Sequence, residues 1–164
     1  MSVQDFSFAC YSSNGVLGTS TQRIYVMNPD SADSGWSLTI APQNVTDLWV
    51  GTNGSYDFND PTGLGCTDGV DLDSVAGVMS IDASGSTLNI GACPSCNISG
   101  ISKGSLASFS QDSVNSITLL TADASSSDMG DWILTGVSIL QTIPGEQPAG
   151  NDYGIDLVLT VTAL

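Results

Sequence analysis

Apolar and polar residues alternate in short runs along this 164-residue chain, and no long stretch follows the period of an α-helix. The clearest run is the last one, in which every second residue from Ile155 to Ala163 is apolar. Helix-favouring residues are scarce, since Glu146 is the single glutamate, whereas strand- and turn-forming Ser, Thr, Gly, Asp and Val are abundant. The sequence therefore predicts an all-β fold: an antiparallel β-sandwich of jelly-roll or Greek-key type with about ten short strands and little helix.

Apolar residues at alternate positions mark where the strands are expected. A first strand runs from Val3 to Tyr11, and a long one over 132–141 is expected to bulge at Gly136. The segment 106–109 fits either a strand or one turn of helix. Further strands are marked by Ile24 and Val26, by Trp36, Leu38 and Ile40, by Leu48 and Val50, by Tyr56 and Phe58, by Val78 and Ile81, by Leu88 and Ile90, and by Ile117 and Leu119. We expect an N-terminal strand over residues 1–12, which is a candidate donor strand, and a single β-sandwich domain over 13–164.

Charge narrows the classes of function. Seventeen acidic residues stand against two basic ones, Arg23 and Lys103, and the chain has no histidine. Nucleic-acid binding needs clusters of Lys and Arg, and membrane insertion needs a longer apolar run than any present here, so we expect neither. Because general acid–base catalysis near neutral pH usually depends on histidine, we also expect that the protein is not an enzyme. What remains is a protein that binds cations or associates through backbone and apolar contacts.

Four cysteines, Cys10, Cys66, Cys93 and Cys96, indicate disulfides and an oxidising compartment. Cys93 and Cys96 are close enough in sequence to close a small loop, which would leave Cys10 to pair with Cys66, but the sequence leaves the pairing open. A redox or zinc site is the alternative for the Cys-Pro-Ser-Cys motif, although no histidine or second such motif completes a zinc site. Sequons for N-glycosylation begin at Asn44, Asn53 and Asn97 and are compatible with export.

An acidic, glycine-containing stretch runs from Asn59 to Asp73. Calcium prefers several hard oxygen ligands, so the sequence predicts a calcium site whose ligands are Asp60, Asp68, Asp71 and Asp73. The register of an EF-hand is missing. The alternative is a solvated surface loop in which the aspartates cap turns through local hydrogen bonds.

Aromatic residues suggest a second kind of site. Trp36 and Trp132 stand in phase with aliphatic strand faces, so we expect them to anchor the core. Trp49 is out of phase with Leu48 and Val50 and is the candidate for stacking against a cell-wall or matrix glycan.

Short motifs resemble known surface proteins. A Trp-x-Leu triplet stands at Trp36–Leu38 and another at Trp132–Leu134, and the chain closes with Ile143-Pro144 followed by a Pro/Gly connection and a last alternating strand. Together these resemble WxL-type bacterial cell-surface β-sandwich domains and, more loosely, camelysin-like extracellular matrix fibre proteins. The resemblance implies an exported, non-catalytic β-sandwich on the cell exterior. In WxL domains the second triplet ends the domain, whereas here the last strand has no tryptophan.

The N-terminal strand suggests how such a protein would assemble. Phe6 and Phe8 share one face of the strand over 3–11, and the Gly-containing stretch 12–21 follows it. A terminal strand on a flexible joint can leave its own sheet and complete that of a neighbour. The functional prediction is therefore a subunit of an extracellular, cell-surface filament or coat, a homopolymer joined by strand exchange. The alternative is a cell-surface glycan-binding module.

Overall fold

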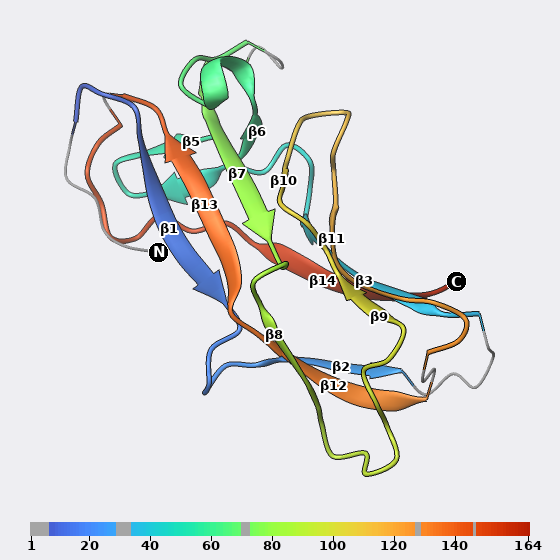
Figure 1. Cartoon of the computed structure of the whole chain (residues 1–164). Coiled ribbons are helices and arrows are strands. Elements are labelled where there is room, and N and C mark those ends of the chain that lie inside the picture. Colours follow the sequence, from blue (N-terminus) through green and yellow to red (C-terminus); the bar gives the residue numbers. More distant parts are fainter. Residues whose placement is uncertain (1–6, 29–33, 70–72, 127–128, 146) are drawn as a thin grey trace.

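The computed structural model describes residues 7–28, 34–69, 73–126, 129–145 and 147–164 (Figure 1). These residues form an all-β, antiparallel fold, which confirms the prediction of fold class; one short 3₁₀ turn, η1 (Thr62–Leu64), is the helical element among them. No helix in these ranges is long and apolar enough to cross a membrane. The strands are β1 (Tyr11–Leu17), β2 (Ile24–Asn28), β3 (Trp36–Pro42), β4 (Trp49–Gly51), β5 (Gly54–Tyr56), β6 (Asn59–Asp60), β7 (Gly77–Asp82), β8 (Thr87–Ile90), β9 (Ile101–Lys103), β10 (Ala107–Ser108), β11 (Ile117–Ala122), β12 (Gly130–Thr135), β13 (Val137–Ile143) and β14 (Leu157–Ala163).

One layer of the sandwich consists of two sheets that meet at a bend. The upper sheet has the strand order β1-β13-β7-β10, with β6 also paired to β7, and the lower sheet has the order β2-β12-β8 (Figure 1). The chain passes from β12 into β13 through Gly136, whose φ of 79° lies in the left-handed region that favours glycine. The N–H of Gly136 donates to the carbonyl of Gly18 at 2.7 Å, which ties the two outer corners of the bend together. In place of the bulge expected at Gly136, the chain turns there from one sheet into the other.

The second layer is a four-stranded sheet with the order β14-β3-β11-β9. Its inner face meets the bent layer in one hydrophobic core, at whose centre the fully buried rings of Trp36 and Trp132 lie 5.0 Å apart. On one side the layers are linked, because Lys103 of β9 donates to the carbonyl of Ser86 just before β8. The core position expected for both tryptophans is confirmed.

The predicted first strand is wrong over its described part. Residues 7–10 form no strand, with a bend at Phe8 and Ala9, and the first strand, β1, begins at Tyr11 and pairs with β13 through Leu17. The stretch expected to be a flexible joint is thus largely strand, and β1 crosses the expected boundary between residues 12 and 13. The cause is tertiary: Cys10 is bonded to Cys66, and β13 supplies a full row of backbone partners to a polar segment.

Candidate functional site

The last strand, β14, lies at an open edge of the second layer. It pairs with β3 without a break, from Leu157 opposite Pro42 to Ala163 opposite Trp36, and has no strand partner on its other side among the described residues. Apolar side chains on both of its faces are uncovered: Val158 is 44%, Leu159 40% and Val161 41% exposed. Leu159 and Val161 belong to the face that turns toward the core, so the facing layer is too narrow to cover it.

An apolar groove of about 380 Å³ runs beside β14. Its walls are Leu159 and Val161 on one side and the beginning of β2 on the other, and buried Leu38 and Ile24 contribute to its floor. The remaining lining residues are Leu17, Gly18, Gln22, Arg23 and Tyr25. Since β2 is the outer strand of its own sheet, the groove separates two strand edges. Among the described residues, the sandwich is therefore linked by the Lys103–Ser86 hydrogen bond near β8 and β9, whereas no strand closes the space between β2 and β14.

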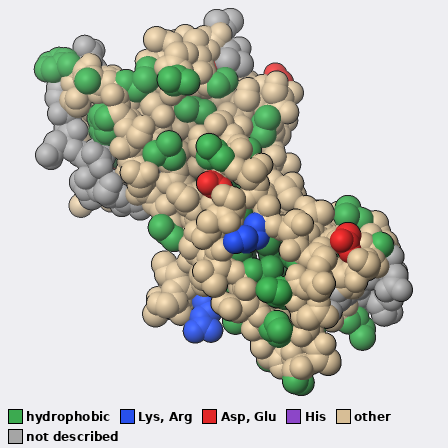
Figure 2. Space-filling view, viewed as in Figure 1, with side chains coloured by type: hydrophobic (Ala, Val, Ile, Leu, Met, Phe, Trp, Pro, Cys, Tyr) green, Lys and Arg blue, Asp and Glu red, His purple; other side chains and the backbone are tan. Residues whose placement is uncertain are grey.

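Arg23 gives this groove a positive charge. It is one of the two basic residues of the chain, and both basic side chains, drawn in blue, lie on the face shown in Figure 2. Its Nε donates to the carbonyl of Ser20 at 3.0 Å, and the guanidinium carries further N–H donors. An otherwise acidic protein thus places a cation beside exposed apolar side chains.

β14 lacks the usual protections of an edge strand. Natural edges are commonly blunted by lysine, proline, bulges or short length. The seven residues of β14 include no charged residue and no proline, and their register with β3 has no bulge. The other edges of this protein are shorter or more polar, such as two-residue β10 and three-residue β9. β14 is therefore the edge best suited to pair with an added strand.

Hydrogen bonds from residues 50–53 hold the segment that leads into β14. Asp152 accepts hydrogen bonds from the backbone N–H of Thr52, at 2.8 Å, and from its hydroxyl. Asn53 donates to the carbonyl of Ala149, and Val50 and Gly154 exchange backbone hydrogen bonds. The β4–β5 hairpin thus holds the connection that leads into β14, so β14 is suited to receive a strand and not to leave its sheet.

Phe8, the predicted donor residue that the structure describes, stands two positions before a disulfide-bonded cysteine. Cys10 is bonded to Cys66, and Cys93 to Cys96, so both pairings suggested by the sequence are confirmed. Phe8 stands just before the Cys10 anchor with 80% of its surface exposed, whereas Phe6 lies outside the described residues. β1 is held by its ladder with β13 and by the disulfide, so only the arm ahead of Cys10 remains as a donor.

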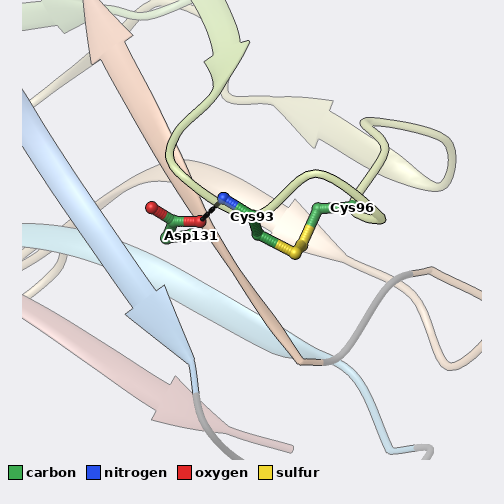
Figure 3. A group of neighbouring side chains, drawn as sticks. All are labelled: Cys93, Cys96 and Asp131. Atoms are coloured by element: carbon green, nitrogen blue, oxygen red, sulfur yellow. Dashed lines mark hydrogen bonds between the residues drawn. A yellow bond between two sulfur atoms is a disulfide. The ribbon is translucent and has the colours of Figure 1, made fainter.

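The disulfide Cys93–Cys96 lies beside Asp131 of β12 (Figure 3). The carboxylate of Asp131 accepts the backbone N–H of Cys93 at 2.8 Å and of Ala92 at 2.6 Å, and also the hydroxyl of Tyr25. The hydrogen bond from Tyr25 is the main reason that the pKa of Asp131 is lowered. A carboxylate so close to the sulfurs disfavours a thiolate, which a redox centre or a zinc site would need. The geometry therefore fits a structural loop closure.

The acidic residues of the predicted calcium site do not gather where they are described. Asp60 is fully buried, and its two carboxylate oxygens accept the N–H groups of Thr62 and Gly69 at 3.0 and 2.9 Å. Asp73 accepts the N–H of Val75, and Asp68 is exposed. Among the described acidic residues, these three do not approach one another as metal ligands do, and Asp71 lies outside the described ranges. Asp60 organises the loop, and calcium binding stays a prediction.

Trp49, the predicted glycan-binding residue, is half-buried. Its ring stacks on Tyr56 with centroids 5.8 Å apart, and its indole N–H donates to the buried side chain of Gln141 at 2.9 Å. Tyr153 packs against the other side of this cluster, 5.2 Å from Tyr56. The indole N–H is thus used in a hydrogen bond within the protein, and the ring is partly covered by Tyr56. Glycan binding by Trp49 stays a prediction.

Comparison of the chain with protein-family models, with curated proteins and with solved structures gave no match. The resemblance to WxL-type and camelysin-like proteins therefore stays a prediction. The groove and Arg23 were not predicted as a site. Their one signal in the sequence is that residues 157–164 carry no charged side chain in a chain of seventeen acidic residues.

Proposed function

We propose that the protein is a non-catalytic structural subunit on the cell exterior, which joins copies of itself into a filament or coat by adding a strand at the edge of β14. The observation that carries this proposal is the combination at β14: an unblocked edge whose inward face is exposed. Adding a strand there would pair backbone groups and cover Leu159 and Val161 at the same time.

The charge distribution supports an edge-based contact. The net charge of −15 makes a broad contact between two copies repulsive. β14 has no charge of its own, so strand pairing there brings backbone and apolar groups together with few carboxylates. Backbone pairing also needs no partner of opposite charge.

The two disulfides support the location. Disulfides persist in oxidising compartments and are rare in reducing ones, so the bonded cysteines fit a non-reducing environment. We propose in addition that this non-reducing environment is the cell exterior. A location outside the cell agrees with a small domain that carries two disulfides.

Electron microscopy and sedimentation of the purified protein test the proposal. We expect filaments or ordered sheets that dissociate on dilution. A protein that sediments as a monomer at high concentration and in high salt would refute self-assembly.

A charge placed on the inward face of β14 tests the edge. Val161→Lys should abolish assembly, because the ammonium group would enter the groove of the acceptor. Met27→Lys is the matched control: it makes the same charge change at an exposed residue of β2 that does not line the groove. Assembly that survives Val161→Lys, or that is lost equally in the control, would show that β14 is not the contact.

A further inference from the structure

We propose that the groove between β14 and β2 receives the N-terminal arm of a second copy, residues 1–9, and that Arg23 of the acceptor pairs with Asp5 of that arm. This inference rests on the proposed function and identifies both halves of the contact. The strand that joins the acceptor is then the segment ahead of the Cys10–Cys66 bridge, and not β1.

The groove is chemically specific. Leu159 and Val161 offer an apolar wall, buried Leu38 an apolar floor, and Arg23 a cation at the side of β2. An occupant that suits all of them has alternate large apolar side chains and a carboxylate close to them. It must also be extended, because the space lies between two strand edges.

The arm has this chemistry. In the sequence Val3-Gln4-Asp5-Phe6-Ser7-Phe8, an extended backbone places Phe6 and Phe8 on one face and Asp5 and Ser7 on the other. Asp5 is the one acidic residue ahead of Cys10. With Phe6 and Phe8 directed into the groove, Asp5 points to the outer side of the arm, where the long, exposed side chain of Arg23 reaches its carboxylate.

The end of the groove at β1 lies beyond the reach of Phe6 of the same subunit. Leu17 and Gly18 line this end, and β1 carries the chain from Cys10 to Leu17, a span of roughly 23 Å at about 3.3 Å per residue. Phe6 stands four positions before Cys10, and its backbone reaches only about 14 Å from it. We therefore assign the groove to the arm of a second copy.

The consequence is a chain of subunits. Donor arm and acceptor groove are different surfaces on one molecule, so each copy that gives its arm keeps an open groove of its own. Contacts of this head-to-tail kind do not close on themselves when the rotation between neighbours leaves the next groove accessible, and they build filaments. The Cys10–Cys66 bridge anchors the root of the donated arm to its own sandwich, so tension on the filament is carried by a covalent link.

A charge reversal across the contact tests the pair. Arg23→Glu and Asp5→Arg should each raise the critical concentration for assembly about tenfold or more, as expected for the loss of a charge-assisted hydrogen bond and its replacement by repulsion. The double variant Arg23→Glu/Asp5→Arg should restore assembly. Lys103→Glu, which reverses the other basic residue at the linked side of the sandwich, should have little effect; circular dichroism checks that every variant is folded.

Deletion of residues 1–9 gives a second readout that does not depend on charge. The shortened chain keeps both disulfides and should remain a folded monomer that cannot polymerise. Two results would overturn the assignment of the arm and Arg23: polymers formed by the shortened chain, or a double charge reversal that does not restore assembly. If the wild type still assembles and Val161→Lys still does not, assembly at β14 would stand. A wild-type protein that never assembles would instead refute the proposed function itself.

Discussion

Tyr25 on β2 donates its phenolic hydroxyl to the carboxylate of Asp131 on the neighbouring strand β12. Tyr25 lies opposite Ile133, so the pair is a diagonal contact on one face of the sheet. Because the same carboxylate accepts the N–H groups of Ala92 and Cys93, one buried side chain links β2, β12 and the loop closed by Cys93–Cys96. Protonation of the Asp131 carboxylate in acid should therefore destabilise the folded protein.

Protonation of Asp131 should lower stability. The hydrogen bond from Tyr25 and those from the backbone hold the pKa of Asp131 below its usual value. The unfolded chain therefore binds the proton before the folded one does, and the stabilisation is lost as the pH falls below about 4. We expect Asp131→Asn to lower the melting temperature at pH 7 and to flatten its decline between pH 5 and pH 3, in thermal scans at several pH values.

Asp156→Asn is the control for this measurement, because Asp156 is an exposed carboxylate at the entry to β14. It should leave both the melting temperature at pH 7 and the slope in acid close to those of the wild type. An Asp131→Asn variant with an unchanged acid slope would contradict the role given to this carboxylate.

The two disulfides should differ in what they contribute. Cys10–Cys66 closes a loop with a sequence separation of 56, and Cys93–Cys96 one with a separation of 3. From the chain entropy that each removes from the unfolded state, we expect about 4 kcal/mol for the first bridge and about 2 kcal/mol for the second. Denaturant titrations of the Cys10→Ser/Cys66→Ser and Cys93→Ser/Cys96→Ser variants measure this difference. The opposite order would mean that the small loop stabilises the fold by another route.

The sequence was sufficient where side-chain alternation and burial coincide. Trp36, Leu38 and Ile40 stand at alternate positions and point into the core, because successive side chains of a strand face opposite sides. It failed near the N-terminus, where Phe6, Phe8 and Cys10 show the same alternation. In this region the pairing with β13 determines which residues form the strand, and β13 pairs with the polar segment that begins at Tyr11. The local sequence does not encode which distant strand is available.

The candidate site shows a further limit of the sequence. Alternation in β14 predicts a strand with one buried face, and the strand is present. Burial of that face depends on the width of the opposite layer, which ends at β2 and leaves Leu159 and Val161 uncovered. The position of Arg23 beside them follows from the same arrangement. The groove exists because one layer is wider than the other, and no local pattern in the sequence reports that difference in width.

Gly130 should resist substitution for a steric reason. A Cβ at this position would lie 2.5 Å from Sγ of Cys96 and 2.9 Å from the ring of Trp132. Neither group can retreat, since the sulfur is in a disulfide and the ring is fully buried. We expect Gly130→Ala to reduce the free energy of unfolding by about 1–3 kcal/mol, as overpacking of a core does.

Gly85→Ala is the matched control, because a Cβ there would meet no atom within 4 Å. It should be neutral or stabilise the protein slightly by restricting the unfolded chain. Equal effects of the two substitutions in urea titrations would show that the packing around Gly130 is looser than described.

Buried Gln141 joins the β4–β5 hairpin to the bent layer. Its side-chain carbonyl accepts the indole N–H of Trp49, and its amide donates to the backbone carbonyls of Asp57 at 2.9 Å and of Thr142 at 2.8 Å. Gln141→Leu removes all three bonds from a fully buried position and should cost about 1–3 kcal/mol. In a Trp49→Phe background, where the indole donor is already gone, the same substitution should cost less. A double-mutant cycle that shows no coupling between the two residues would contradict this link.

Assembly should strengthen as salt is added. Each copy carries a net charge of −15, so a growing filament accumulates like charge that ions screen, whereas strand pairing at β14 and apolar burial in the groove do not depend on screening. The critical concentration measured by light scattering should therefore fall as sodium chloride rises from low to physiological concentration. The Arg23–Asp5 pair works against this trend but is a single attraction among many repulsions.

Calcium chloride at matched ionic strength separates screening from specific binding. If calcium lowers the critical concentration more than sodium does, and Asp68→Asn/Asp73→Asn removes the difference, the calcium site is supported. Equal effects of the two salts would leave screening as the whole explanation.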